Sequence, residues 1–234
     1  MDRLADSDGS LNAGATRAAA EETYVFSPEV VMLSNPTGAR AEAFRTLRTH
    51  IMAQHLEDGR RGLAICAASG GVGATFTAVN LAVALAQIGA KVLLIDGDLR
   101  SAGVDQFIRP AKPLQGVLQA LGRTDTDLSD EIQVDVVENL SVMFAGGTTP
   151  SAQELLAGAR FSEVVERCLR DYDLTIIDTP PANSCADARR VSTVVGYSLI
   201  VAKRHDTFIN DIKALASQLR EDRAHVVGTV LNEA

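Results

Sequence analysis

Residues 65–75, ICAASGGVGAT, are the most informative segment of the sequence. It links an apolar run, Leu63–Ala67, to a segment with helical spacing, Phe76–Ile88. Its three glycines let the backbone turn tightly and approach a bound group closely. Successive backbone N–H groups in such a loop, and the N-terminus of the helix that follows, both favour an anion. The pattern therefore predicts a phosphate-binding loop between a strand and a helix.

The loop departs from the usual P-loop pattern at two positions. Thr75 stands where a P-loop hydroxyl coordinates magnesium, but Ala74 occupies the place of the lysine and Ala68 that of the first glycine. Two other interpretations stay open for these residues. A dinucleotide-binding loop would need a third glycine where Phe76 stands, and a purely structural glycine turn would bind nothing.

Short apolar runs typical of buried strands recur along the chain, and helical stretches separate most of them. Strands that are apolar on both faces and joined by helices indicate a parallel sheet covered on both sides. We therefore expect one α/β domain of the P-loop NTPase type, with a doubly wound, mainly parallel sheet and helices on both faces. The expected strands are Leu63–Ala67, Val92–Ile95, Leu140–Phe144, Leu174–Ile177, Ser198–Ala202 and Val226–Leu231, and the expected helices include Phe76–Ile88, Phe161–Arg170 and Phe208–Leu219.

The N-terminal part of the chain differs in composition from the rest. Residues 1–22 are small and polar and cannot bury enough surface to fold, so they are predicted to form a disordered tail. Tyr24–Leu33 is more apolar and is expected to lie as an extended arm on the domain or on a neighbour. A helix is expected over Ala39–Leu56. We therefore divide the chain into a tail and arm, residues 1–38, and a nucleotide-binding domain, residues 39–234.

Composition excludes several classes of function. The 234 residues include 22 lysines and arginines and 30 acidic residues, a net charge of −8, which argues weakly against a nucleic-acid partner. No apolar run approaches the roughly 18–20 residues of a transmembrane helix. Three cysteines without a CxxC pattern predict neither disulfides nor a zinc site. We expect a cytoplasmic protein that does not insert into a membrane.

Acidic residues follow two of the expected strands. Asp96 and Asp98 come after Val92–Ile95, and Asp178 comes after Leu174–Ile177. Ligands of open parallel sheets bind at the carboxyl ends of the strands, so these carboxylates are expected beside the glycine loop. Carboxylates next to a triphosphate require a divalent cation between them. The arrangement predicts a magnesium–nucleotide site.

Together these motifs resemble those of the bacterial tyrosine kinases (BY-kinases) of capsule and exopolysaccharide synthesis. The glycine loop, DGDLR at 96–100 and DTPP at 178–181 are similar to the Walker A, A′ and B motifs of that family. Glu42, Arg45 and Arg48 match its ExxRxxR oligomerisation motif. The resemblance runs from about Pro36 to Glu233. It also covers SAQELL at 151–156, ADA at 186–188 and VGTVLN at 227–232.

The resemblance implies ATP or ADP with Mg²⁺ as ligands and assigns roles to particular residues. Asp96 would act as base or as a water-mediated metal partner, and Asp98 as a second catalytic acid of the metal site. Thr75 would bind the metal directly and Asp178 from the outer shell, while Asn232 would help to hold the adenine. The expected nucleotide-binding residues are Ser69, Gly70, Gly71, Val72, Gly73, Ala74, Thr75, Phe76, Arg100 and Asn232.

The chain departs from the family in two ways. Ala74 removes the ammonium that would hold the β- and γ-phosphates, and another base, such as Arg100 or one from a neighbouring subunit, would have to replace it. The tyrosine cluster at the C-terminus of autophosphorylating members is missing. Among the tyrosines of this chain, Tyr24 is the best candidate acceptor, because Tyr172 and Tyr197 lie next to strands and are expected to pack.

Three hypotheses for the function follow. The first is a nucleotide-binding regulator of exopolysaccharide polymerisation, impaired in catalysis, that forms homo-oligomers and is recruited to the inner face of the cell membrane by a membrane-embedded co-polymerase protein. The second is an active tyrosine autokinase of the same pathway. The third is a partition or division-site ATPase, a class whose signature lysine is replaced here by Ser69.

Overall fold

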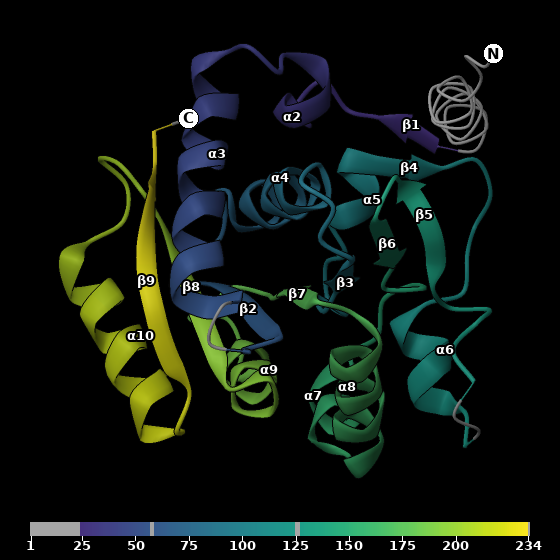
Figure 1. Cartoon of the computed structure of the whole chain (residues 1–234). Coiled ribbons are helices and arrows are strands. Elements are labelled where there is room, and N and C mark those ends of the chain that lie inside the picture. Colours follow the sequence, from purple (N-terminus) through teal and green to yellow (C-terminus); the bar gives the residue numbers. More distant parts are fainter. Residues whose placement is uncertain (1–23, 57–58, 125–126, 234) are drawn as a thin grey trace, which may run out of the picture.

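The computed structural model describes residues 24–56, 59–124 and 127–233, so the predicted tail at 1–22 lies outside it. Its main feature is a seven-stranded sheet in the order β5-β6-β3-β7-β2-β8-β9 (Figure 1). Neighbouring strands are parallel except β5 and β6, which confirms the mainly parallel, doubly wound sheet. The strands are β2 (Gly62–Ala67), β3 (Val92–Asp96), β5 (Gln133–Val137), β6 (Leu140–Met143), β7 (Leu174–Asp178), β8 (Tyr197–Lys203) and β9 (His225–Asn232).

Helices cover both faces of the sheet (Figure 1). One face carries α2 (Val31–Ser34), α3 (Ala39–Ile51), α4 (Ala74–Ala86) and α5 (Val104–Phe107). The other carries α6 (Val117–Gly122), α7 (Ala152–Ala157), α8 (Ala159–Asp171), α9 (Asp187–Val195) and α10 (Ile209–Glu221). None of the helices in the described part of the chain is both long enough and apolar enough to cross a membrane.

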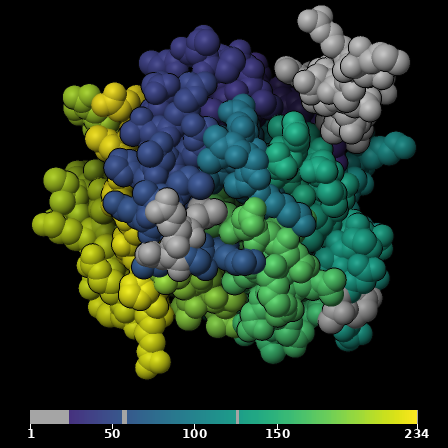
Figure 2. Space-filling model, in the orientation of Figure 1, coloured from purple at the N-terminus to yellow at the C-terminus, as the bar shows by residue number. Residues whose placement is uncertain are grey.

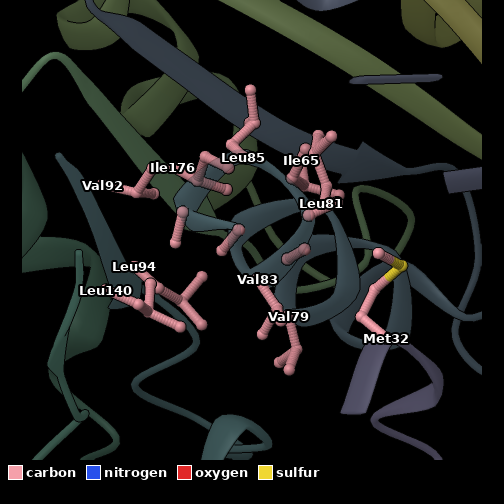
Figure 3. Close-up of a cluster of buried hydrophobic side chains, with 14 of the residues drawn as sticks. Met32, Ile65, Val79, Leu81, Val83, Leu85, Val92, Leu94, Leu140 and Ile176 are labelled. Atoms are coloured by element: carbon pink, nitrogen blue, oxygen red, sulfur yellow. The ribbon is translucent and has the colours of Figure 1, made fainter. Parts of the chain in front are cut away.

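The alternation of side chains along β2 explains this layering. Leu63 and Ile65 point into the core shared with α4, whereas Ala64 and Cys66 point into the opposite core. Successive side chains of a strand face opposite sides, so a strand covered on both faces must be apolar throughout. Figure 3 shows the first core, where Val79 and Val83 of α4 lie among the side chains of the sheet.

The segment before α3 corrects the predicted arm. Only Tyr24–Phe26 (β1) is extended, and it pairs antiparallel with β4 (Ile108–Pro110). Met32 of α2 is 1% exposed and packs in the same core as the side chains of α4 (Figure 3), and the side chain of Asn80 accepts a hydrogen bond from the backbone N–H of Met32 at 3.3 Å. Figure 2 shows the segment, in purple, packed against the rest of the molecule. Burying the apolar side chains of residues 24–38 removes their surface from water and so stabilises the folded state. These residues therefore pack as part of the domain.

Several element boundaries also differ from expectation. The helix expected over Ala39–Leu56 is α-helical only to Ile51 and continues as a π-helical turn, Met52–Leu56. α7 and α9 are additional helices, and both are short, with charged and polar residues between their apolar ones. Their apolar stripes cover the sheet without producing a long periodic pattern, which is why the sequence did not reveal them.

Candidate functional site: a phosphate-loop cleft at the strand ends

The glycine loop connects β2 to α4 as predicted. Gly71 and Gly73 have φ values of +75° and +88°, a left-handed conformation that favours glycine. A Cβ atom on Gly73 would overlap the side-chain amide of Asn232, so the loop and β9 approach each other closely. That amide donates a hydrogen bond to the carbonyl oxygen of Val72 at 3.0 Å, which anchors the loop to the last strand.

The loop borders a cleft of about 580 Å³. The cleft lies over the N-terminus of α4, whose first backbone N–H groups lack intrahelical acceptors and are suited to bind an anion. The expected residues Ser69–Phe76, Asp98 and Asn232 line it. Residues that were not predicted also line it, namely Glu29, Arg40, Ala67, Ser101, Phe107, Thr179, Pro181 and Lys203.

Asp96 and Asp98 organise the loop after β3 through the backbone. One carboxylate oxygen of Asp96 accepts hydrogen bonds from the N–H groups of Gly103 and Val104, both at 3.0 Å, and the other accepts one from Asp98 at 3.2 Å. Asp98 in turn accepts hydrogen bonds from the two N–H groups of residues 100 and 101. Both side chains are buried, so the loop is fixed before any ligand arrives.

Thr75 and Asp178 meet beneath the glycine loop. The hydroxyl of Thr75 donates a hydrogen bond to one carboxylate oxygen of Asp178 at 2.6 Å. The other oxygen of Asp178, Oδ1, is buried and has no hydrogen-bond partner among the described residues. A buried carboxylate oxygen without a partner is costly, so this site is suited to a cation or to its bound water.

The electrostatics of the site point the same way. Burial raises the pKa of Asp178 well above its usual range, and the nearby charge of Asp96 raises it further, although the hydroxyl of Thr75 opposes both. Burial also raises the pKa of Asp96 to about 6, although the backbone N–H groups that donate hydrogen bonds to its carboxylate lower it. A divalent cation would relieve the repulsion among these carboxylates, because it favours their ionised forms.

The residues present therefore fit magnesium bound together with a nucleotide. No group of three or more His, Cys, Asp or Glu side chains within the described ranges is arranged to hold a metal by itself. Magnesium usually binds one or two protein groups and completes its shell with phosphate oxygens and waters. Thr75 and Asp178 would supply the protein side of such a shell, while the roles of Asp96 and Asp98 stay predictions.

Arg100 does not lie where a substitute for the missing lysine is needed. Its Nε donates to the carboxylate of Asp187 at 2.7 Å, and Asp187 is buried at the start of α9. Arg100 lines a second cleft together with Asp96, and it is not among the described residues that line the cleft at the glycine loop. Its predicted contact with nucleotide has no support from this position.

The proposed phosphoacceptor is not accessible. Tyr24 is 9% exposed, and its hydroxyl donates to the side-chain oxygen of Gln133 at 3.5 Å. Tyr172 is also buried, in agreement with a packing role. Tyr197 is partly buried and packs between the rings of His55 and His225. The prediction of Tyr24 as the best candidate acceptor therefore has no support from its buried position.

The Glu42, Arg45 and Arg48 side chains of α3 do not behave as one exposed stripe. Arg45 donates to Glu42 at 3.0 Å and to the carbonyl oxygen of Pro36 at 2.5 Å. Arg48 donates to the carbonyl oxygen of Ala84 in α4 at 3.0 Å, so it fastens α3 to α4. Glu42 is exposed, whereas Arg45 and Arg48 are each partly buried.

The raised pKa of Asp96 predicts how stability depends on pH. Its folded-state pKa of about 6 exceeds the roughly 3.9 of an unfolded chain, so the native state binds more protons between these values. The free energy of unfolding should therefore fall as pH rises through this window. Between pH 5 and pH 7.5 the contribution is about 1.4 kcal/mol.

Urea unfolding without magnesium at these two pH values measures the effect. Asp96→Asn keeps the shape of the side chain and should make the fall in stability smaller. An equally steep fall in this variant would show that Asp96 is not the titrating group.

Comparisons with known proteins identify the relatives of this fold and site. A family model described as an AAA domain matches residues 60–223. CapB of Staphylococcus aureus, provisionally named a tyrosine-protein kinase, is 33% identical over 92% of each chain. The chain belongs to the bacterial tyrosine kinase family.

Other members differ from this chain in length. The kinase domain of the Escherichia coli tyrosine kinase ETK superposes with a TM-score of 0.81 at 30% identity, over 88% of this chain and 80% of that domain. The tyrosine-protein kinase Wzc of Salmonella typhi is 28% identical over 87% of this chain, but the match spans only 28% of Wzc. The chain thus corresponds to the kinase portion of the longer BY-kinases.

Proposed function

We propose that the protein binds ATP or ADP with Mg²⁺ in the phosphate-loop cleft and regulates exopolysaccharide polymerisation or export. The contact between Thr75 and Asp178, with one buried carboxylate oxygen left for a cation or its water, carries the nucleotide part of the proposal. The chain belongs to the bacterial tyrosine kinase family, whose motifs are those of the kinases of capsule and exopolysaccharide synthesis. This membership supports a role in exopolysaccharide synthesis.

We propose further that Ala74 impairs phosphoryl transfer more than it impairs binding. The backbone cradle, Thr75 and the acidic residues remain in place to hold a nucleotide. Transfer depends on charge positioned at the moving phosphoryl group, and a lost charged hydrogen bond costs roughly 1.5–3 kcal/mol. The protein would then act as a nucleotide-dependent switch.

A membrane-embedded co-polymerase protein is the proposed partner. CapB matches this chain over nearly its whole length, whereas Wzc is a much longer protein. A second polypeptide would bring the switch to the inner face of the cell membrane, and the protein itself would stay in the cytoplasm. The net charge of −8 gives no support to a nucleic-acid partner.

Incubation with Mg–ATP, followed by mass spectrometry for phosphotyrosine, separates this function from an active autokinase. We expect the parent chain to give no more phosphotyrosine than the Asp96→Ala/Asp98→Ala variant. Modification of the parent alone would establish the autokinase and overturn the proposal of impaired transfer. The names of the curated relatives reported above favour either of these over a partition ATPase.

Self-association through α3 is part of the proposal. Replacing both Arg45 and Arg48 by alanine is expected to raise the dissociation constant of the oligomer at least about ten-fold, as loss of close charge pairs at an interface does. Light scattering over a concentration series measures this. Because Arg48 also holds α4, urea unfolding must show that the variant remains folded. Arg220→Ala, on the exposed side of α10, is the control. An unchanged mass in the folded double variant would contradict the proposal.

A further inference from the structure

We propose that Lys203 supplies the positive charge at the nucleotide phosphates that Ala74 cannot supply. This inference rests on the proposed nucleotide binding and adds a residue to that site. Lys203 is the last residue of β8, and it lines the same cleft as the glycine loop.

The sheet topology explains why Lys203 reaches this cleft. β8 is the parallel neighbour of β2, with Val201 opposite Ala67, so both strands end at the same edge of the sheet (Figure 1). The glycine loop leaves β2 at this edge, and Lys203 extends β8 beyond the pairing with Ala67. On its other side Lys203 pairs with Asn232 of β9, whose side-chain amide donates a hydrogen bond to the carbonyl oxygen of Val72 in the loop.

The backbone of Lys203 is held firmly. Its N–H donates to the hydroxyl of Thr207 at 2.9 Å, and its carbonyl oxygen accepts from the N–H groups of Thr207 and Asp206 at 3.0 and 3.3 Å. The side chain is half-buried. Within the described residues its ammonium makes no ion pair or side-chain hydrogen bond, so its charge is available to a ligand.

The neighbouring arginine side chains are less suitable than Lys203 to hold the phosphates. Arg100 is committed to Asp187 at 2.7 Å, and Arg204 pairs with Glu233 at 2.8 Å. Arg40 also lines the cleft, but it is exposed in the first turn of α3, where water and salt screen its charge. A half-buried ammonium interacts more strongly with an anion than an exposed one does, because it is screened less.

The acidic residues of the cleft require a positively charged side chain nearby. The carboxylates of Glu29 and Asp98 line it as well, and a triphosphate would add further negative charge beside them. A P-loop normally offsets this charge with the lysine that is Ala74 here. Lys203 can do so from the adjacent strand, because a lysine side chain is a point charge on a flexible stem and needs no fixed geometry.

Titration with a fluorescent ATP analogue and magnesium tests the assignment. We expect Lys203→Met to weaken binding roughly 10–150-fold and Lys203→Arg to restore most of it. Lys213→Met, which removes the same charge from an exposed site on α10, should leave affinity unchanged. Urea unfolding of each variant checks that the fold is intact.

A double-mutant cycle with Ala74→Lys separates a phosphate contact from a general effect of charge. If Lys203 replaces the missing ammonium, Lys203→Met should cost much less affinity in a chain that also carries Ala74→Lys, because the two charges serve the same phosphates. An equal loss in both backgrounds would overturn the assignment.

The remaining outcomes are also decisive. Parental affinity in Lys203→Met would show that Lys203 is only a solvated residue at a strand end. A loss confined to Arg40→Met would place the charge on α3 instead. If neither the parent nor Ala74→Lys binds the analogue, the proposed function fails, and the role of Lys203 fails with it.

Discussion

Gly97→Ala is expected to lower the free energy of unfolding by about 1–3 kcal/mol and to abolish tight nucleotide binding. A Cβ atom at this position would lie 2.6 Å from the backbone oxygen of Asp178 and 2.8 Å from Cγ2 of Ile177. The backbone cannot move away easily, because the N–H of Gly97 donates to that same oxygen and Asp96 pairs with Asp178 in the sheet. Any relief would shift the two acidic strand ends apart.

Gly122→Ala is the matched control for this substitution. A Cβ atom there meets nothing within 4 Å, and the backbone is not left-handed. This variant should be neutral or slightly stabilising, since alanine reduces the entropy of the unfolded chain. Urea unfolding and nucleotide titration of the two variants provide the comparison. Equal behaviour would mean that the close approach at Gly97 does not hold the site together.

Ala74→Lys is expected to raise the affinity for Mg–ATP by up to roughly 10–150-fold, the value of one charged hydrogen bond, with a smaller gain in the parent than in Lys203→Met because Lys203 serves the same phosphates. Ala74 is the first residue of α4 and lines the cleft, so a lysine there would reach the phosphates while its stem lies along the cleft wall. Stability should change by no more than about 0.5 kcal/mol, as for most substitutions outside the core.

Ala74→Met separates charge from packing in this experiment, because it adds an unbranched stem without the ammonium. Its affinity should stay near that of the parent. If methionine raised affinity as much as lysine, contact with the stem would explain the gain. If lysine gave no gain, the cleft would not hold a triphosphate in the P-loop manner.

The parts that sequence predicted share a physical basis. The buried strands β2, β3 and β7 are apolar on both faces, so they stand out as short apolar runs wherever they occur. The glycine loop can be recognised in the sequence because Gly71 and Gly73 have positive φ angles, a conformation that few other residues adopt. The acidic strand ends follow from the direction of parallel strands alone.

The parts that sequence missed depend on contacts between distant residues. Nothing near Arg100 indicates that it pairs with Asp187, and nothing near Met32 indicates that Asn80 holds it in the core. Lys203 left a detectable signal, since it ends an apolar run beside β2. Its place at the cleft depends on the order of the strands in the sheet, in which β8 lies next to β2, and the sequence alone does not give that order.

The phosphate-loop cleft is proposed to bind Mg–nucleotide despite Ala74. Titration of the parent chain with a fluorescent ATP analogue, with and without magnesium, beside Asp96→Ala/Asp98→Ala, tests it most directly. We predict saturable, magnesium-dependent binding by the parent that the double variant loses. The absence of saturable binding in the parent, or equal binding by the double variant, would contradict it.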